Sequence, residues 1–288
     1  MILLKNCDVT IIGGGPAGMS AAIQLKRQGI NPILIEKDKL GGCLFNANLI
    51  ENYPGFPNGI NGKKLADLII KQFTENDIET IFSEAITITG KTDDLFEVTL
   101  KNKSKINSKY LIIATGSVPE KLKLENEADL NKTKYLFYEI KEIPDSVRGH
   151  FSIIGSGDAA FDYALNLSKR GNKVTILCRN QPKALKLLKE RASKDRNIEV
   201  LDNIIVNKFM RDNDKIKIIM NKSEMITDYI LIAIGRKSNL EIIKNIKEQK
   251  NLFIVGDVNK GQYRQLAISI GDAIEVAMKI GGENRNNK

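Results

Sequence analysis

The first forty residues alternate between apolar runs and one amphipathic stretch. Residues 7–12 form a short apolar run typical of a buried strand, and a Gly-rich turn follows at 13–18. A helical pattern then runs over 16–28 and ends before a glycine, and residues 32–35 form a second apolar run. This order of strand, turn, helix and strand predicts a parallel βαβ unit.

The first Gly-rich turn reads GGGPAG and has the glycine spacing of a dinucleotide-binding turn. Gly13 allows the tight turn, Gly15 lets the backbone approach a pyrophosphate, and Gly18 lets the helix pack closely on the strand. The helix N-terminus favours the pyrophosphate, and Glu36, 23 residues after Gly13, can accept hydrogen bonds from ribose hydroxyls. The stretch therefore predicts a dinucleotide site.

The same order recurs in the middle of the chain. Residues 151–154 predict a strand, GSGDAA at 155–160 is a second Gly-rich turn, a helical pattern continues to about residue 170, and 173–177 predict another strand. Strands that alternate with helices favour parallel sheets covered by helices, so the chain as a whole predicts an α/β fold with two similar units.

The second turn differs from the first where the ribose would lie. The residue 23 positions after Gly155 is Cys178 and not an acid, and Arg179 follows it. An acid would repel a 2′-phosphate, whereas Arg179, with Lys183 close in sequence, can bind one. We therefore expect FAD at the first site and NADPH, in preference to NADH, at the second. The alternative is that Arg179 is a solvated surface cation.

Two further apolar runs complete the first site. Residues 111–119 predict a buried strand that ends in a turn of small residues, and 251–258 predict a strand that delivers Asp257 to its carboxyl end, where open α/β sheets bind ligands. A helix is then expected over GQYRQLAISIGDAIEVAMKI, residues 261–280. Its apolar stripe, which we assign to the core, comprises Leu266, Ile270, Ala273, Ile274 and Ala277.

Length and composition are those of a globular protein. With 288 residues the chain is long enough for two domains, and its apolar (42%) and charged (27%) fractions are ordinary. No apolar run approaches the roughly 20 residues that span a bilayer, and the N-terminus does not resemble a signal peptide. We therefore expect a cytoplasmic protein that does not cross a membrane.

The rare residue types limit the chemistry. The three cysteines are far apart and match neither a CxxC nor a zinc spacing, so we expect no metal site and no disulfide framework. His150 is the single histidine, which leaves little room for Ser-His-Asp chemistry. The net charge of +9 is spread along the chain, which favours a solvated basic surface over a nucleic-acid patch.

Seven motifs occur in the order found in one flavoprotein family: IIGGGPAGMSAAI, GG-C-L, ENYPGFPNGINGKKL, IIATGSVP, IIGSGDAAFDYAL, AIGR and GDV…YRQLAISIGDA. Over nearly its whole length the chain resembles the low-molecular-weight thioredoxin reductases. The resemblance implies two Rossmann-like three-layer domains, an FAD domain at 1–117 and 245–288 interrupted by an NAD(P)H domain at 118–244. It also implies a homodimer.

The resemblance implies roles for the residues that match these motifs. Around FAD they are Gly13, Gly15, Pro16, Ala17, Gly18, Glu36, Lys37, Gly41, Gly42, Cys43, Leu44, Asn52, Ala85, Ile86, Ala114, Thr115, Gly116, Gly256, Asp257, Arg264, Gln265 and Leu266. Around the pyridine nucleotide they are Gly155, Gly157, Asp158, Ala159, Arg179, Lys183, Gly235 and Arg236. No protein side chain is expected to be catalytic, because the flavin carries the chemistry.

The chain departs from the family where a redox CxxC would stand. Residues 131–149 contain no cysteine, so an internal dithiol relay is not expected. Cys43 stands where the family usually has Gln, and packing is its favoured role over flavin contact. The altered stretch, with Asp162 and Tyr163 after the second turn, resembles the ferredoxin/flavodoxin–NADP⁺ reductases of this type. Those reductases have a C-terminal extension whose aromatic residue can cover the flavin, and we expect no such cover from this chain.

Three functions follow as hypotheses. The first passes electrons from NADPH through FAD to ferredoxin or flavodoxin, whose acidic surfaces the basic chain would attract. The second reduces a quinone, O₂ or a partner's disulfide, in the last case with Cys43 as a test residue. The third is a flavoprotein subunit fed by reduced ferredoxin, with a degenerate NADPH site, because Asn180 stands where a second Arg would be expected.

Overall fold

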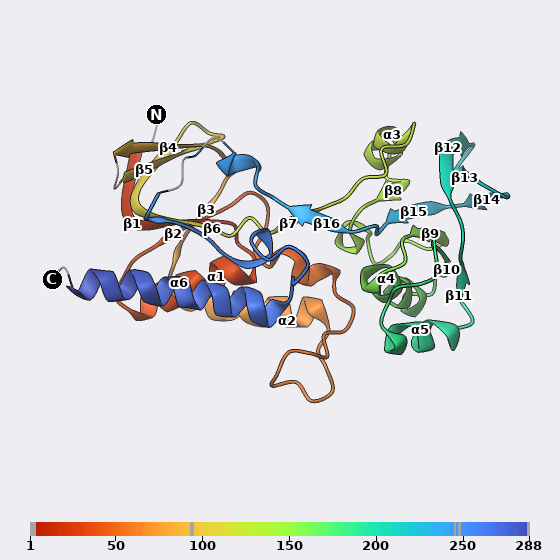
Figure 1. Ribbon diagram of the computed structural model, residues 1–288, viewed down its shortest axis with the longest axis horizontal. Coiled ribbons are helices and arrows are strands. Elements are labelled where there is room, and N and C mark those ends of the chain that lie inside the picture. Colours follow the sequence, from red (N-terminus) through yellow and green to blue (C-terminus); the bar gives the residue numbers. More distant parts are fainter. Residues whose placement is uncertain (1–3, 93–94, 245, 247–248, 287–288) are drawn as a thin grey trace. The chain divides into compact units, whose positions relative to one another are not determined.

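The described chain folds into two compact units. The computed structural model describes residues 4–92, 95–244, 246 and 249–286 (Figure 1). Unit 1 comprises Met1–Leu44, Glu51–Val118 and Lys237–Lys288, and unit 2 comprises Phe45–Ile50 and Pro119–Arg236. Where the chain passes between them, β7 (Ser117–Pro119) pairs with β16 (Arg236–Ser238).

Unit 1 is built on a mainly parallel sheet of order β3-β2-β1-β6-β5-β4, with β17 also paired to β6. Strands β1, β2, β3, β6 and β17 are parallel, and β4 and β5 run antiparallel as a hairpin. The elements are β1 (Leu4–Ile12), α1 (Pro16–Arg27), β2 (Ile33–Glu36), η1 (Gly42–Asn46), α2 (Gly62–Thr74), β3 (Glu79–Phe82), β4 (Ala85–Thr92), β5 (Leu95–Leu100), β6 (Lys105–Ile113), η3 (Glu241–Ile243), β17 (Leu252–Ile254), η4 (Gly256–Val258) and α6 (Leu266–Asn286).

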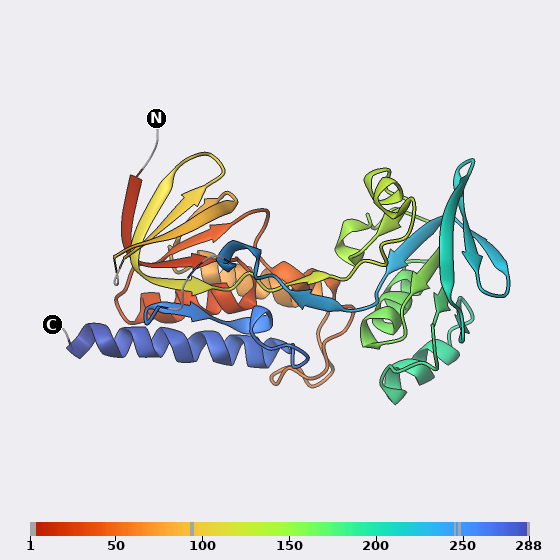
Figure 2. The same cartoon turned by 45° about the horizontal axis from the view of Figure 1, so that its top comes forward.

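Both faces of this sheet are covered, because its central strands are apolar on both sides. Helices α1, α2 and α6 lie on one face and the β4–β5 hairpin lies on the other (Figures 1 and 2). Val9 and Ile11 of β1 join the core of the helical side, which includes Met19 of α1. Ile12 joins the core of the hairpin side with Phe96. The described part of unit 1 therefore has three layers.

Unit 2 repeats this plan with a parallel sheet of order β11-β10-β9-β15-β8. An antiparallel sheet β12-β13-β14 forms a separate layer. The elements are α3 (Glu127–Lys132), β8 (Leu136–Phe137), η2 (Ile140–Glu142), β9 (His150–Ile154), α4 (Asp158–Lys169), β10 (Lys173–Leu177), α5 (Lys186–Ser193), β11 (Ile198–Leu201), β12 (Val206–Asp212), β13 (Lys215–Met220), β14 (Glu224–Thr227) and β15 (Tyr229–Ile232).

The core of unit 2 is divided by its parallel sheet. Phe151 and Ile153 of β9 pack with Phe161 of α4 on the helical side. The next residue, Ile154, packs on the opposite side with Phe209 of the antiparallel sheet, because successive side chains of a strand point to opposite faces. The turn between β9 and α4 is thus carried on a strand that is buried on both sides.

The predicted α/β fold with two three-layer units is confirmed, and the strands and helices around both Gly-rich turns lie within a few residues of their predicted bounds. Helix α6 begins at Leu266 and not at Gly261, where the expected helix starts. Its core residues include Ala273 and Ala277, whereas Leu266, Ile270 and Ile274 are half-buried. The compact units divide at 118/119 and 236/237, and unit 2 also takes in 45–50, which the predicted domain bounds of 118–244 do not include.

Candidate functional site

The first Gly-rich turn leaves no room for side chains at two of its glycines. Gly13 has a φ of +114°, and a Cβ on it would lie 2.3 Å from the carbonyl oxygen of Ala114. A Cβ on Gly18 would lie 1.9 Å from the carbonyl oxygen of Gly13. A Cβ on Gly15, which caps α1, would have no atom within 4 Å. Gly13 and Gly18 therefore close the turn, and open space remains at Gly15.

Glu36 lies beside the first Gly-rich turn and is hydrogen-bonded to it. It ends β2 and is half-buried, and its two carboxylate oxygens accept hydrogen bonds from the backbone N–H groups of Gly14 (2.7 Å) and Asp38 (2.9 Å). The bond from Gly14 ties the carboxylate to the turn. Each oxygen keeps a further lone pair, so the group can still accept hydrogen bonds from ribose hydroxyls.

This arrangement fits the pyrophosphate and ribose of a dinucleotide. The open backbone at Gly15 stands at the N-terminus of α1, where unpaired N–H groups and the helix dipole attract a phosphate. Residues 41 and 42 lie against the same turn, because the Gly41 N–H donates to the carbonyl of Gly14 (2.9 Å) and a Cβ on Gly42 would lie 3.1 Å from the Gly15 Cα. Three predicted segments are thereby brought together.

The C-terminal segment also reaches this turn. A Cβ on Gly256 would lie 2.8 Å from the Cβ of Ala17, so η4 packs directly on the start of α1. Asp257 accepts a hydrogen bond from the Ser269 hydroxyl (2.7 Å), and the Gly256 N–H donates to Asp272 (2.8 Å). Ser269 and Asp272 were not predicted; their place in the first turns of a helix that follows the GDV segment is the only sequence signal for them.

Asn52 and Gln265 are 213 residues apart in sequence and touch in the structure. The Asn52 side-chain amide donates to the Gln265 side-chain oxygen (2.9 Å). Arg264 donates from Nε to the carbonyl of Asp257 (3.2 Å), which places it beside η4. Leu44 is buried, Cys43 is half-buried and Leu266 is half-buried at the start of α6. The residues expected near the flavin thus come from four separate segments of unit 1.

The remaining residues predicted for FAD lie after β6, after β2 and at the start of β4. Ala114 continues β6, its N–H donating to the carbonyl of Ile12 (2.8 Å). Thr115 and Gly116 bond to Asn239 through the Thr115 hydroxyl (2.7 Å) and the Gly116 carbonyl (3.0 Å). Lys37 and Ile86 are exposed, and Ala85 is half-buried at the start of β4.

One aromatic side chain at this edge was not predicted. Phe82 stands in register with Glu36 on the neighbouring strand β3 and is 61% exposed. The sequence signal for it is the apolar pair Ile81–Phe82 that ends this short strand. An exposed aromatic ring next to the acid expected at the ribose offers a face to a nucleobase.

The second Gly-rich turn has the same construction. Gly155 has a φ of +156°, and a Cβ on it would lie 2.3 Å from the carbonyl oxygen of Ala233, whereas a Cβ on Gly157 would have no atom within 4 Å. The backbone N–H groups of Lys183 (2.7 Å) and Ala184 (3.0 Å) donate to the carbonyl of Ser156 and hold the turn. The space at Gly157, at the N-terminus of α4, fits a second pyrophosphate.

The side chains around this turn distinguish it from the first. Asp158 at the start of α4 accepts a hydrogen bond from the Leu185 N–H (2.8 Å), and Ala159 is exposed. Cys178 is fully buried and its thiol donates to the carbonyl of Gly155 (3.4 Å); burial, with a contribution from Asp202, raises its pKa to about 11. The position of the missing acid is therefore filled by a neutral, inert thiol.

The cations of this region differ in their surroundings. Arg179 and Lys183 are exposed, and within the described residues neither forms an ion pair. Gly235 is exposed with a φ of +130°, and the next residue, Arg236, donates from Nη1 to the Glu139 carboxylate (2.6 Å). Arg179 and Lys183 are available to a phosphate, whereas Arg236 is already paired.

Glu139 is a buried carboxylate that was not predicted. Besides Arg236, it accepts from the Lys141 ammonium (3.0 Å) and from the Asn46 side-chain amide (3.2 Å). Burial acts to raise the pKa of Glu139, but Arg236 and Lys141 outweigh it and hold that pKa below its ordinary value. The sequence signal for the network is a single acid inside the apolar run LFYEI.

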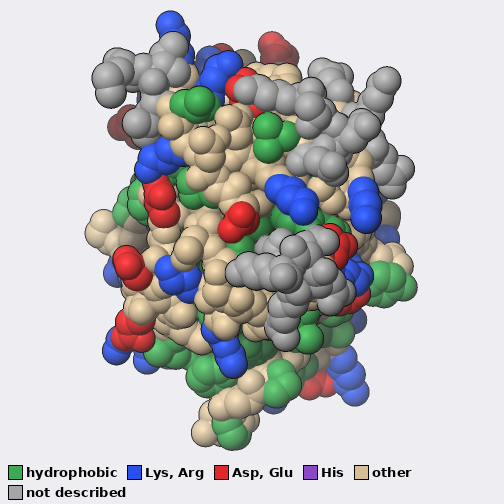
Figure 3. All heavy atoms as spheres, turned by 90° about the vertical axis from the view of Figure 1, so that its left-hand side faces the viewer, with side chains coloured by type: hydrophobic (Ala, Val, Ile, Leu, Met, Phe, Trp, Pro, Cys, Tyr) green, Lys and Arg blue, Asp and Glu red, His purple; other side chains and the backbone are tan. Residues whose placement is uncertain are grey.

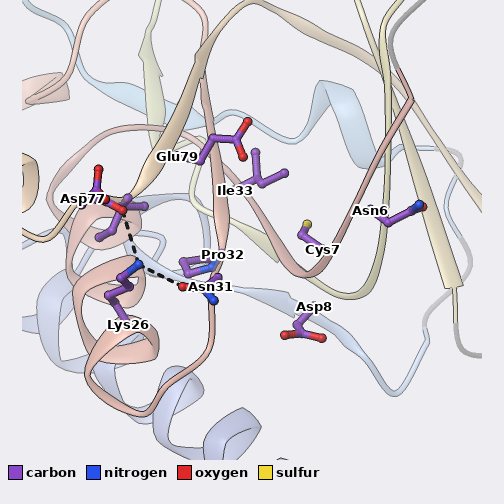
Figure 4. Close-up of a pocket in the computed structure, with 10 residues that line it drawn as sticks. Asn6, Cys7, Asp8, Lys26, Asn31, Pro32, Ile33, Asp77 and Glu79 are labelled. Carbon is purple, nitrogen blue, oxygen red and sulfur yellow. Dashed lines mark hydrogen bonds between the residues drawn. The ribbon is translucent and has the colours of Figure 1, made fainter.

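A cavity of about 610 Å³ lies elsewhere in unit 1 (Figure 4). Lys26 points into it and donates to Asn31 Oδ1 (2.9 Å) and to the Asp77 carbonyl (3.4 Å). Burial raises the pKa of Cys7, which keeps its thiol protonated. The cavity stands at the amino ends of the strands, away from the first Gly-rich turn, and is lined by Asn6, Cys7, Asp8, Lys26, Asn31, Pro32, Ile33, Asp77, Ile78 and Glu79.

Four other features concern His150, possible metal ligands, membrane-spanning helices and the surface charge. The His150 Nε2 lies 2.8 Å from the Thr175 hydroxyl, and burial, together with Lys173, lowers the pKa of the ring. Among the described residues no group of three or more His, Cys, Asp or Glu is placed to hold a metal ion. No helix in the same part of the chain is long and apolar enough to cross a membrane. On the face drawn in Figure 3, Lys and Arg are interspersed with Asp and Glu.

Comparison with known proteins gives one consistent result. Residues 7–273 match the family described as pyridine nucleotide-disulphide oxidoreductase. The chain is 29% identical to a thioredoxin reductase of Buchnera aphidicola (94% of this chain, 90% of the relative) and 28% identical to thioredoxin reductase 1 of Saccharomyces cerevisiae (94% and 95%).

Solved structures of thioredoxin reductases are similar to this chain over almost its whole length. The Lactococcus lactis thioredoxin reductase in its FR conformation superposes with a TM-score of 0.86 at 25% identity, covering 96% of this chain and 99% of that one. The thioredoxin reductase of T. acidophilum gives a TM-score of 0.85 at 24% identity, covering 97% and 99%. The latter likeness is one of fold.

Proposed function

We infer that this chain, which belongs to the pyridine nucleotide-disulphide oxidoreductase family, passes electrons from NADPH through FAD to a small acidic carrier, a ferredoxin or a flavodoxin. As a thioredoxin reductase-like flavin oxidoreductase it uses FAD and NADPH. The observation that carries the choice of acceptor is the cysteine inventory. Cys7, Cys43 and Cys178 include no CxxC, and Cys7 and Cys178 have raised pKa values, so the chain has no dithiol to relay electrons to a disulfide.

Bound FAD would supply the group that takes two electrons as a hydride from NADPH and releases them one at a time. The balanced reaction with ferredoxin is one NADPH and two oxidised ferredoxins giving one NADP⁺, one proton and two reduced ferredoxins. The residues of the chain would bind the cofactor and orient it. The Gly15 backbone would hold the pyrophosphate of FAD, and Glu36 its ribose, while Asn52 and Gln265 would order the flavin end.

The second unit would hold NADPH in the same way. The backbone at Gly157 would take the pyrophosphate, and Arg179 with Lys183 the 2′-phosphate, for which both are exposed and unpaired among the described residues. We further expect a cytoplasmic homodimer. The net charge of +9 would attract an acidic carrier, which raises the association rate at low salt.

Reduction of a carrier tests the acceptor directly. With NADPH as donor, the protein should reduce ferredoxin or flavodoxin, and the second-order rate constant should fall by about tenfold between low and physiological salt, because screening weakens the steering. Stopped-flow absorbance of the carrier measures it. A rate that does not change with ionic strength would contradict the docking argument.

A thioredoxin-type disulfide is the second candidate acceptor, favoured by the similarity of the chain to thioredoxin reductases. It would need Cys43, the half-buried thiol next to the residues expected at the flavin. The same assay run with thioredoxin and with Cys43→Ser separates the two candidates: carrier reduction that survives the substitution, with no thioredoxin reduction in either protein, supports the first.

Arg179 should set the choice of nucleotide. We expect Arg179→Ala to weaken binding of NADPH by about tenfold to a hundredfold while changing NADH binding little, since only NADPH offers the charged 2′-phosphate. Anaerobic titration of the flavin absorbance with each nucleotide measures both affinities. Lys189→Ala, an exposed cation on α5, is the matched control, and equal losses for the two nucleotides would show that Arg179 does not bind the 2′-phosphate.

A further inference from the structure

The first strand of unit 1 is paired along the whole of one edge and along only part of the other. β1 pairs with β6 from Leu4 to Ile12, but with β2 only from Thr10 to Ile12. In the part of the chain that the structure describes, no third strand pairs with β1, so the backbone of residues 4–8 has one side that no strand uses. We call this side the open edge. Its backbone N–H and C=O groups are a template for a further strand.

Cys7 and Pro32 explain why β2 leaves this edge open. The Cys7 thiol accepts a backbone hydrogen bond from Ile33 and donates to the carbonyl of Val9 (3.3 Å). Pro32, the residue before β2, has no N–H that could continue the ladder. The ladder between β1 and β2 therefore stops at Ile33, which stands opposite Thr10.

The 610 Å³ cavity lies beside the open edge (Figure 4). Residues 6–8 of β1 form one wall of it, and residues at the amino ends of β2 and β3 form the rest. Pro32 is buried and Ile78 is half-buried, so part of the lining is apolar. The volume lies in the range of ligand pockets, roughly 300–1,000 Å³. A strand added at the open edge thus has a space to occupy.

The carboxylates around the cavity favour a basic segment. Asp8 and Asp77 are exposed on opposite sides of the cavity, and neither forms an ion pair with a residue that the structure describes (Figure 4). Glu79 is paired with Lys5, and the two hydrogen bonds that Lys26 donates go to neutral oxygens. Two carboxylates are therefore available to a cation, on a chain whose net charge is +9.

We propose that the open edge binds, by strand addition, an extended segment of a partner protein that carries Lys or Arg at alternate positions. Backbone hydrogen bonds to residues 4–8 would hold the segment. Alternate side chains of a strand point to the same face, so their cationic heads would reach Asp8 and Asp77 while their aliphatic stems cover Pro32 and Ile78. The site lies away from the first Gly-rich turn, and the proposal does not depend on the electron acceptor.

Three acetylated octapeptide probes test the proposal by fluorescence anisotropy with the holoprotein. An alternating Lys-Val peptide should bind. An alternating Glu-Val peptide should bind at least about tenfold more weakly, although the net charge of the protein attracts acidic peptides. A Lys-Val peptide that is N-methylated at its four central residues keeps its charge but lacks the backbone donors, and should also bind at least about tenfold more weakly.

Two charge-removing variants test the carboxylates. Asp8→Asn and Asp77→Asn should each weaken binding of the Lys-Val probe by about twofold to fivefold, the size expected for an exposed ion pair. Asn tolerates the left-handed backbone at residue 77, where φ is +49°, so the fold should be kept. Asp129→Asn, at an exposed acid on α3 of unit 2, is the matched control and should leave probe binding unchanged.

Hydrogen exchange locates the bound probe. Saturating Lys-Val peptide should slow the exchange of amide hydrogens within residues 4–8 by about tenfold, because those on the open edge gain acceptors. Reduction of the bound flavin by NADPH should be unchanged in Asp8→Asn, so a failure of the proposed function and a failure of this site give different results.

Each contrary outcome is specific. Absent binding of the Lys-Val probe, equal binding of the Glu-Val or N-methylated probe, full binding in both aspartate variants, or unchanged exchange in residues 4–8 would overturn the proposal. Protection of residues 4–8 that rises with protein concentration in the absence of probe would show that a second copy of the chain pairs with the open edge, which would also overturn it.

Discussion

Replacing Gly18 by alanine should lower the free energy of unfolding by about 3 kcal/mol, whereas the same change at Gly15 should alter it by less than about 1 kcal/mol. The reason is the atom that each new methyl group meets. At Gly18 it would lie 1.9 Å from the backbone oxygen of Gly13, and backbone cannot rotate away. At Gly15 it would meet nothing within 4 Å.

The order should reverse when FAD binding is measured per folded molecule. The methyl group at Gly15 would occupy the space that we propose for the pyrophosphate, so we expect FAD to bind about tenfold to a hundredfold more weakly. Chemical denaturation of the apoprotein and fluorescence titration with FAD give the two quantities. The pair is a sharper test than either variant alone because the substitution is chemically the same.

Gly271→Ala is the control for alanine itself. Gly271 is exposed in α6 and a Cβ there would meet nothing within 4 Å, so the change should stabilise the helix by up to about 1 kcal/mol. If Gly15→Ala and Gly18→Ala destabilised the fold equally, the division of roles between the two glycines would be wrong. Unchanged FAD affinity in Gly15→Ala would remove the pyrophosphate from this turn.

The parts of the site that sequence predicts are those that local geometry dictates. Gly13 and Gly155 hold positive φ values in turns between a strand and a helix, and only glycine does so without strain, so their spacing alone locates both turns. The position of Glu36 can also be predicted from local sequence, because β2 must end at the edge of the sheet where α1 begins. These features depend on short stretches of chain, which the apolar pattern describes well.

Contacts between segments far apart in the chain could not be predicted from the sequence. Asn46 meets Glu139 across 93 residues and Asn48 meets Asp162 across 114, and neither contact has a periodicity or spacing that marks it. An acid such as Glu139 is expected to be exposed until its partners are known, because a buried carboxylate is tolerated only with cations in contact. The packing of 45–50 in unit 2 has the same origin: the segment is placed by tertiary hydrogen bonds and not by its own propensity.

Glu139→Ala is the substitution from which we expect the largest loss of stability. Its side chain is 9% exposed and it pairs with both Arg236 and Lys141, so its removal leaves two cations and the Asn46 amide without their acceptor. Breaking one member of such a buried network lowers the free energy of unfolding by about 3–5 kcal/mol. Urea denaturation followed by circular dichroism measures the loss, and the transition of unit 2 should shift.

The pH dependence of stability tests the direction of the Glu139 contribution to the free energy of unfolding, whatever its magnitude. The pKa of Glu139 is lowered in the folded protein, so its contribution to stability is complete above the ordinary carboxyl pKa and is lost as the pH falls through the lowered value. Wild-type protein should therefore lose stability on acidification below about pH 4.5, and Glu139→Gln should flatten that part of the curve while keeping the shape of the side chain.

Glu241 supplies the contrast that makes this result interpretable. A hydrogen bond from Lys244 lowers its pKa too, but the pair is exposed at η3 and solvent screens it. Glu241→Gln should leave the unfolding midpoint where it is at every pH. If both substitutions flattened the acidic part of the stability curve equally, the net charge of the molecule would be responsible and not the buried network. If only Glu139→Gln did so, burial would be what lets an ion pair contribute to stability, since both acids have lowered pKa values.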